Sequence, residues 1–239
     1  MNEGDNMKSL QVVTPHMKCI FNCPFCIAKG HVHNNSFVNN YLLNHDLWQN
    51  NLIKVIKEND DLRYVVITGT NEPMQSLQCV KDIINTVKSI NKDIQIELQT
   101  RYYKQNELYN NLDVVAYSIS DVNLLNKIKP LGKISRYVII LTNSFNNYSL
   151  KDILDLIPGM VSQVTFKKLI NTNGVNKDVD DYILNNSVDD NTLNKLSQDI
   201  DMYDGNLSIR LDLNCMDSAD RYKVFREDGN VYDNWDSYS

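Results

Sequence analysis

The sequence lacks any long hydrophobic run. Its longest apolar stretches, such as residues 137–141, are far shorter than the roughly 18 consecutive apolar residues that a membrane-spanning helix needs. The first eight residues are polar, and no apolar segment typical of a secretory signal peptide follows them. We therefore expect no membrane association and a cytoplasmic location.

Positive charge is also scarce. The chain has 24 Lys and Arg residues against 30 Asp and Glu residues, which gives a formal net charge of −6. An acidic balance disfavours a broad surface for the phosphate backbone of nucleic acids. We expect no extended nucleic-acid surface, although a local basic pocket for one nucleotide remains compatible with this composition.

Glycine and proline are few, with eight and five residues in a chain of 239, and no linker rich in either is visible. The length suits one large domain, and the chain shows no internal repeat. Up to about residue 170, short β-branched runs alternate with segments of helical periodicity. This alternation predicts parallel strands joined by crossover helices, arranged either as a partial (β/α)6 barrel or as a doubly wound sheet. The six expected strands are residues 10–14, 63–68, 94–100, 114–120, 136–142 and 163–169.

The pattern changes after residue 170. Residues 171–190 are rich in Asn and Asp, and a helix is expected near residues 190–200. Residues 207–213 and 221–225 alternate in polarity, and Asp228-Gly229 is a hairpin turn signal. The sequence thus predicts a core of residues 1–170 and an extension of residues 171–239, with a helix and a small antiparallel sheet packed on the core.

Three of the five cysteines lie within eight residues. Cys19, Cys23 and Cys26 have the spacing C-x3-C-x2-C, while Cys79 and Cys215 are isolated. An odd, clustered set disfavours a disulfide framework, and soft thiolates select zinc, copper(I) or iron–sulfur clusters.

A structural zinc site usually draws on a second pair of ligands, which the sequence lacks, although His16, His31 or His33 could complete one. Three thiolates would leave one iron of a [4Fe–4S] cube open for another ligand.

The cysteines follow the first expected strand directly, in the segment TPHMKCIFNCPFCIAKGHVH, and the aromatic Phe25 precedes the last of them. This arrangement resembles the radical S-adenosylmethionine (SAM) superfamily. The resemblance implies an α/β fold with a partial (β/α)6 TIM-like barrel and a C-terminal antiparallel extension. It also implies a [4Fe–4S] cluster on Cys19, Cys23 and Cys26, with SAM chelating the open iron.

A second motif, GTNEP, follows the second expected strand. The superfamily typically has Gly-Gly-Glu-Pro there, where it holds the amino group of SAM. In this chain Thr70 replaces the second glycine and Asn71 is an additional residue, so the donors and acceptors need not match those of the family. The resemblance implies the cofactor-binding residues Phe25, Gly69, Thr70, Asn71, Glu72, Pro73, Thr100, Ser118 and Thr142. Further candidates at strand ends are Gln99, Ser120, Asn143 and Lys167.

The C-terminal segment resembles the hairpin of radical SAM enzymes that carry a second cluster. No cysteine follows Val231, however, and Cys215 is solitary, so we expect no auxiliary cluster. Arg221, Arg226 and Trp235 are candidates to close the substrate pocket, with a solvated hairpin as the alternative.

The resemblance implies reductive cleavage of SAM to a 5′-deoxyadenosyl radical, which abstracts hydrogen from a nucleotide or other small-molecule substrate. It further implies a reducing partner of the flavodoxin or ferredoxin type. The short core and single cluster loosely resemble the branch that contains the GTP cyclase of molybdopterin biosynthesis, viperin and the deazaguanine synthase. Two alternatives stay open: a modifier of peptides or proteins, including a glycyl-radical activase, and a non-catalytic zinc or iron–sulfur protein.

Overall fold

The computed structural model describes residues 7–15, 17–30, 37–213 and 222–235. The expectations for His16, His31, His33, Cys215 and Arg221 lie outside these residues. Within the described part, no helix is long and apolar enough to cross a membrane.

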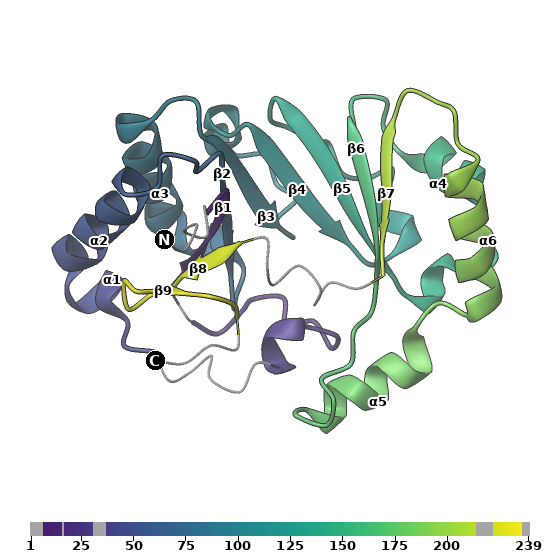
Figure 1. Cartoon of the computed structure of the whole chain (residues 1–239). Coiled ribbons are helices and arrows are strands. Elements are labelled where there is room, and N and C mark those ends of the chain that lie inside the picture. Colours follow the sequence, from purple (N-terminus) through teal and green to yellow (C-terminus); the bar gives the residue numbers. More distant parts are fainter. Residues whose placement is uncertain (1–6, 16, 31–36, 214–221, 236–239) are drawn as a thin grey trace, which may run out of the picture.

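A nine-stranded sheet forms the centre of the molecule (Figure 1), in the order β7-β6-β5-β4-β3-β2-β1-β8-β9. All neighbouring strands are parallel except β8 and β9, which form an antiparallel hairpin. The expected α/β class, the open barrel-like sheet and the antiparallel C-terminal strands are thereby confirmed. The strands are β1 (Ser9–Thr14), β2 (Tyr64–Gly69), β3 (Gln95–Thr100), β4 (Val114–Ile119), β5 (Ile134–Leu141), β6 (Gln163–Lys168), β7 (Ser208–Asp212), β8 (Lys223–Phe225) and β9 (Val231–Tyr232).

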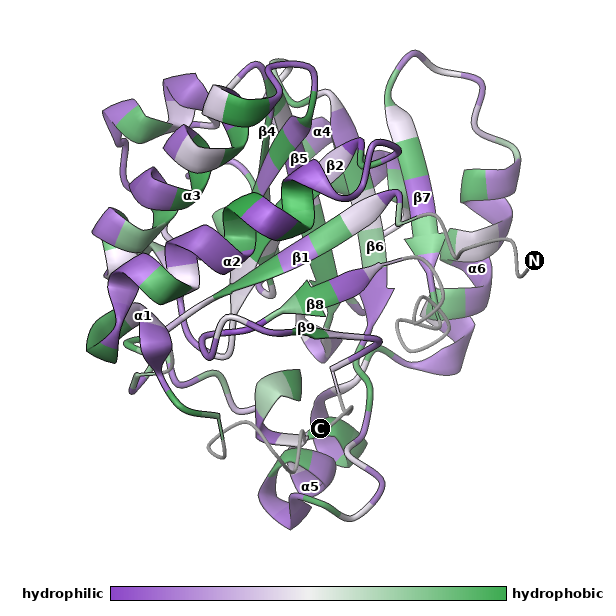
Figure 2. Cartoon of the chain, turned by 60° about the vertical axis from the view of Figure 1, so that its left-hand side comes forward, coloured by the Kyte–Doolittle hydropathy of each residue, from purple (hydrophilic) through white to green (hydrophobic). Residues whose placement is uncertain are grey.

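Helices connect the strands and cover the outer face of the sheet (Figure 1). Helix α2 buries Trp48, Leu52 and Ile56 against the sheet. The longer α3 likewise buries a row of apolar side chains that includes Val80, Ile83 and Val87. In Figure 2 both helices carry hydrophilic and hydrophobic residues in alternating bands, whereas β1 is largely hydrophobic. The α-helices are α1 (Asn40–Leu43), α2 (His45–Lys57), α3 (Leu77–Ile90), α4 (Leu150–Leu156), α5 (Lys177–Asn186) and α6 (Asp190–Asp201). The 3-10 helices are η1 (Ile27–Gly30), η2 (Pro73–Ser76), η3 (Glu107–Asn111), η4 (Val122–Leu124) and η5 (Asn143–Phe145).

The C-terminal strands pair differently from the sequence-based expectation of a separate small sheet. Strand β7 pairs in parallel with β6 and extends the main sheet at one edge, while β8 pairs in parallel with β1 at the other. Alternating polarity indicates a strand with two unlike faces, but it carries no information on which neighbour the strand will have. The division at residue 170 itself stays a prediction.

Helix α5 was not expected, because residues 171–190 are dominated by Asn and Asp. Asn176 caps the helix by accepting a hydrogen bond from the Val179 backbone N–H, and the apolar Val179 and Ile183 lie one turn apart and are buried. Helix α2 is capped by Asn44, whose side chain accepts a hydrogen bond from the Leu47 backbone N–H. Asp121 caps η4 in the same way, by accepting from the Asn123 backbone N–H.

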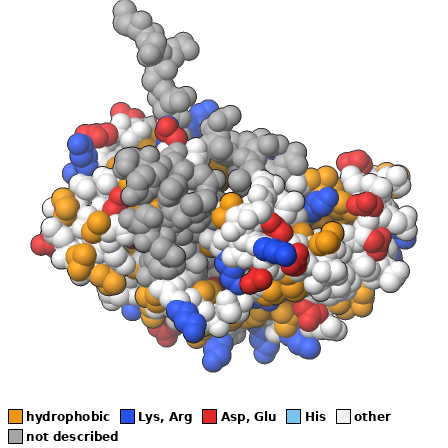
Figure 3. All heavy atoms as spheres, turned by 90° about the horizontal axis from the view of Figure 1, so that it is seen from below, with side chains coloured by type: hydrophobic (Ala, Val, Ile, Leu, Met, Phe, Trp, Pro, Cys, Tyr) orange, Lys and Arg blue, Asp and Glu red, His pale blue; other side chains and the backbone are white. Residues whose placement is uncertain are grey.

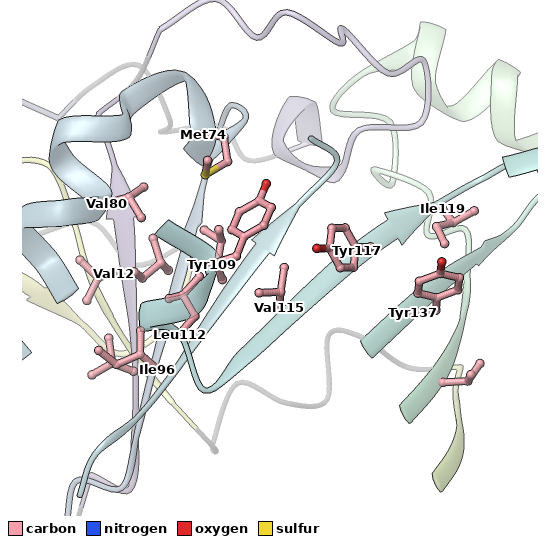
Figure 4. Close-up of a cluster of buried hydrophobic side chains, with 14 of the residues drawn as sticks. Val12, Met74, Val80, Ile96, Tyr109, Leu112, Val115, Tyr117, Ile119 and Tyr137 are labelled. Carbon is pink, nitrogen blue, oxygen red and sulfur yellow. The ribbon is translucent and has the colours of Figure 1, made fainter. Parts of the chain in front are cut away.

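The hydrophobic core lies between the sheet and the helices. Figure 4 shows part of it, where Tyr109, Tyr117 and Tyr137 extend across neighbouring elements. Their rings meet edge to face, with centroids 6.2 Å apart in both pairs, which is a favourable arrangement of aromatic quadrupoles. This core fixes β3, β4 and β5, whose opposite face lines the cavity described next.

Candidate cofactor and cluster site

One cavity of about 600 Å³ lies on the concave side of the sheet and extends to the C-terminal ends of its strands. Ligands of parallel α/β folds bind at this end of the strands. The three clustered cysteines and all five residues of the GTNEP motif line this cavity. Phe25, Thr100 and Ser118 also line it, and so do the further candidates Gln99, Ser120 and Lys167.

The cysteine loop (residues 17–30) follows β1 in the chain and folds into a compact turn that ends in η1. The carbonyl of Cys23 accepts hydrogen bonds from the backbone N–H of Cys26 at 3.2 Å and from Lys29 Nζ at 2.9 Å. Asn22 has a positive φ of 40°, a conformation that asparagine tolerates better than most residues. The loop therefore directs three half-buried thiols, separated by three and two residues, toward one cavity.

Gln75 ties this loop to the segment that follows the GTNEP motif. Its side-chain oxygen accepts a hydrogen bond from the Ile20 backbone N–H at 2.9 Å, and its amide donates to the Lys18 carbonyl at 3.0 Å. Since Gln75 lies in η2, two residues after Pro73, the two motifs are held together by direct contacts.

Phe25 anchors the opposite side of the loop. Its ring packs against a small hydrophobic cluster formed by Leu169, Val179 and Ile183, and its centroid is 6.0 Å from that of Tyr182. Helix α5 supplies most of this surface. The loop is therefore fixed between η2 on one side and α5 on the other, and α5 lies at the bottom of Figure 1.

Arg101 is a site residue that the sequence did not reveal. Its Nη1 donates a hydrogen bond to Cys23 Sγ at 2.8 Å, and its Nη2 donates to Ser120 Oγ at 2.8 Å. The guanidinium also lies over the Phe25 ring, 5.6 Å from its centroid. The one available signal was its position immediately after Thr100, at the C-terminal end of β3.

Glu72 is almost completely buried, and three protein groups donate to its carboxylate. Oε1 accepts from Thr100 Oγ1 at 2.5 Å and from the Met74 backbone N–H at 3.1 Å, while Oε2 accepts from the Arg101 backbone N–H at 2.8 Å. Burial raises the pKa of Glu72, and these hydrogen bonds oppose that shift. Glu72 thus braces β3 against the GTNEP motif in addition to lining the cavity.

Gly69 lies where an added side chain would collide with its neighbours. A Cβ there would lie 2.5 Å from Thr14 Oγ1 and 3.0 Å from Asn71 Oδ1. Both neighbours are buried, and among the described residues neither the Thr14 hydroxyl nor the Asn71 side-chain amide has a hydrogen-bond partner. Buried polar groups are nearly always hydrogen-bonded, so these atoms are exceptions, and of the two residues only Asn71 lines the cavity.

Solved structures with similar folds include radical SAM enzymes. SuiB of Streptococcus suis bound to S-adenosylmethionine matches with a TM-score of 0.61 and 13% identity, over 96% of this chain and 60% of SuiB. The enzyme anSMEcpe with bound AdoMet matches with a TM-score of 0.55 and 12% identity, over 96% of this chain and 78% of its own. HemN of Escherichia coli, a coproporphyrinogen III oxidase, matches with a TM-score of 0.52 and 11% identity, over 82% of this chain and 52% of its own.

The chain has the radical SAM fold. No protein-family model and no curated protein matches its sequence. The chain spans about 60% of the length of SuiB. These structures lend no support to the narrower branch that the sequence loosely resembles.

Thr142 is the one predicted cofactor-binding residue that the structure does not bring into the cavity. It is buried, and its hydroxyl donates to the Ser120 carbonyl at 2.7 Å and lies 2.9 Å from Ser144 Oγ. These contacts direct the Thr142 side chain toward the segment that follows β5. Asn143, the neighbouring candidate, is likewise absent from the cavity wall.

The C-terminal hairpin does not line the cavity with the residues proposed to close it. Arg226 is fully buried, with its guanidinium 4.2 Å from the Phe37 ring centroid and 5.0 Å from that of Trp235. Trp235 Nε1 in turn donates to Gln11 Oε1 at 2.6 Å. Trp235 therefore fastens the C-terminal segment to β1, and Arg226 packs between Trp235 and Phe37.

Cys79 is buried in α3, apart from the cysteine loop, and its burial raises the pKa of the thiol. Among the described residues, no group of three or more Cys, His, Asp or Glu side chains is arranged to hold a single metal ion. A cubic cluster does not need such a group, because its three thiolate ligands bind three different irons.

Proposed function

We propose that the chain is a radical SAM enzyme, with Cys19, Cys23 and Cys26 as the ligands of a [4Fe–4S] cluster and SAM in the adjoining cavity. When bound, the cluster and SAM together would supply a 5′-deoxyadenosyl radical that abstracts a hydrogen atom from the substrate. The observation that carries this proposal is that the three cysteines and residues 69–73 line one cavity.

The residues present fit these cofactors. Three thiolates from one short loop match a cube with one open iron, and the polar residues Thr70 and Asn71 of the GTNEP motif line the adjoining cavity. Gln75 and Arg101 would hold the loop in place, and the apolar packing around Phe25 would keep water from that side. Glu72 would fix the GTNEP backbone rather than act alone as an acceptor.

For the substrate we propose a nucleotide or another small molecule. A volume of about 600 Å³ is in the range of small-molecule sites. A peptide is the second candidate, since solved structures with this fold include SuiB bound to the precursor peptide SuiA and anSMEcpe bound to the Cp18Cys peptide.

The reaction also needs an electron, which we propose comes from a flavodoxin- or ferredoxin-type protein. The cysteine loop exposes Ile20 and Ile27. Figure 3 shows the molecule from below, the side on which the cysteine loop and α5 lie in Figure 1, and exposed apolar side chains are interspersed there with charged ones. Such a mixed apolar and charged surface suits a transient protein contact.

The test is anaerobic reconstitution followed by reduction and measurement of 5′-deoxyadenosine by mass-resolved chromatography. We expect about four irons per chain and SAM cleavage in the wild type. The triple variant with Cys19, Cys23 and Cys26 changed to Ala should lose both, while Cys79→Ala, a matched control outside the loop, should retain both. One zinc per chain and no iron would refute the proposal in favour of a zinc protein.

A further inference from the structure

The concave face of the sheet presents its side chains in rows that cross several strands. Strand register aligns Ser118 with Val138, Val138 with Thr165, and Thr165 with Arg210, and all four residues line the cavity. Arg210 therefore lies at the end of this row, on the edge strand β7, between Ser208 and Asp212, which also line the cavity. An arginine in this row extends from the edge strand toward the space enclosed by the sheet.

Charged neighbours of this row are already paired. Arg136 Nη1 lies 2.5 Å from Glu97 Oε2, and Lys167 Nζ lies 3.6 Å from Asp212 Oδ2. Arg101 donates to Cys23 and Ser120, and the carboxylate of Glu72 accepts from three protein groups.

Two other cationic side chains of the cavity wall are not paired with any described residue. Within the described ranges, the side chains of Arg210 and Lys168 have no hydrogen-bond or ion-pair partner. The described lining carries more cations than carboxylates: Arg101, Arg136, Lys167, Lys168 and Arg210 against Glu72, Glu97 and Asp212. A cationic excess inside a chain of net charge −6 concentrates anions in the cavity, because a recessed wall focuses the local potential.

Arg210 is also remote from the part of the wall that carries the GTNEP motif. In the sheet order, β6, β5, β4 and β3 separate β7 from β2, which leads into that motif. The unpaired cations thus mark a part of the cavity distinct from the one that the GTNEP motif lines.

We infer that Arg210, with the Thr165 hydroxyl beside it and Lys168 at the end of β6, binds an anionic group of the substrate, a phosphate or a carboxylate on a small molecule. This inference rests on the proposed function, since it assigns the substrate of the same cavity. A guanidinium donates two parallel hydrogen bonds to either group, and a neighbouring hydroxyl adds a third.

The test uses the full chain and isothermal titration under anaerobic conditions, with inorganic pyrophosphate and succinate as separate probes. Binding of pyrophosphate alone would identify a phosphate site, and binding of succinate alone a carboxylate site. We expect Arg210→Gln to weaken binding of the preferred probe about tenfold or more. The change removes both the positive charge and the pair of N–H donors that the guanidinium offers to one anion. Arg63→Gln, which makes the same change at an exposed position outside the cavity, should leave binding within about twofold of the wild type.

Equal binding by wild type and Arg210→Gln, or no binding of either probe, would overturn the inference. Iron content and SAM cleavage are measured on the same preparations. If Arg210→Gln loses the probe and the wild type never cleaves SAM, the anion site stands and the proposed function fails. If SAM is cleaved and both proteins bind the probes equally, the proposed function stands and the anion site fails.

Discussion

The guanidinium of Arg101 lies 2.8 Å from the sulfur of Cys23 and donates a hydrogen bond to it. Because the same side chain also bonds Ser120 and covers Phe25, it connects the ends of β3 and β4 to the cysteine loop. In this position the guanidinium would hold one ligand of the proposed cluster in a fixed orientation.

Replacing Arg101 by Met should therefore impair the site without unfolding the protein. We expect lower iron content and a fall in SAM cleavage of about tenfold or more, which corresponds to one or two lost charge-assisted hydrogen bonds. Arg101→Lys keeps the charge but cannot bond Cys23 and Ser120 together, so its activity should be intermediate. Wild-type iron content and cleavage in Arg101→Met would show that the contact has no role in the site.

Gly69→Ala tests the close approach beside the GTNEP motif. The added methyl group would lie 2.5 Å from Thr14 Oγ1, so the strand end must shift, at a cost of about 1–3 kcal/mol in the free energy of unfolding. The same shift should weaken SAM binding in isothermal titration. Gly159→Ala is the matched control, since a Cβ there meets no atom within 4 Å. A Gly69→Ala protein as stable as this control, with unchanged SAM affinity, would contradict the geometry.

The sequence was sufficient to predict the six core strands, because each is a β-branched or apolar run bounded by polar or turn residues. The spacing of Cys19, Cys23 and Cys26 and the position of residues 69–73 likewise predicted which segments meet at the cavity. In both cases the information is local, and the parallel topology then brings the strand ends together.

Features that depend on tertiary contacts were missed. Helix α5 has few good helix formers, and the burial of Val179 and Ile183 against Leu169 outweighs this weak propensity. The role of Arg101 depends on where its long side chain reaches, and no spacing rule encodes that. Thr142 was predicted to line the cavity because it follows a strand end, but its hydroxyl donates a hydrogen bond to the Ser120 carbonyl instead.

Glu72→Gln tests whether the carboxylate braces the motif. Both carboxylate oxygens of Glu72 accept hydrogen bonds, whereas glutamine has one acceptor oxygen and one NH₂ donor group. The NH₂ group would therefore face a backbone N–H or a hydroxyl donor, and at least one of the three hydrogen bonds is lost. We expect the free energy of unfolding to fall by about 1–3 kcal/mol in urea titrations, with weaker SAM binding. Thr100→Val removes one of the same bonds from the donor side, and it also leaves the Tyr102 backbone N–H without its acceptor, so its loss should be of similar size. A stable Glu72→Gln protein with wild-type SAM affinity would argue against this role.

Glu227 gives the protein a pH-dependent stability. Its side chain is buried in the C-terminal hairpin, and burial, only partly offset by its own backbone N–H and by the charge of Arg226, raises its pKa from 4.5 to about 7. Between these two pH values the unfolded chain releases the proton while the folded chain keeps it. The free energy of unfolding therefore decreases as the pH rises through this window, by about 3 kcal/mol in total, and the loss is complete above pH 7.

Glu227→Gln removes this titration, because the amide is neutral at every pH. Urea unfolding should find the variant and the wild type similar in stability at about pH 4.5 and should find the variant more stable above pH 7, by up to about 3 kcal/mol. Comparison of the two proteins at each pH cancels the contributions of all other groups. Glu58→Gln, at an exposed position in an i,i+4 pair with Lys54, should show no such divergence. A constant difference between Glu227→Gln and the wild type across this range would mean that Glu227 does not hold its proton in the folded chain.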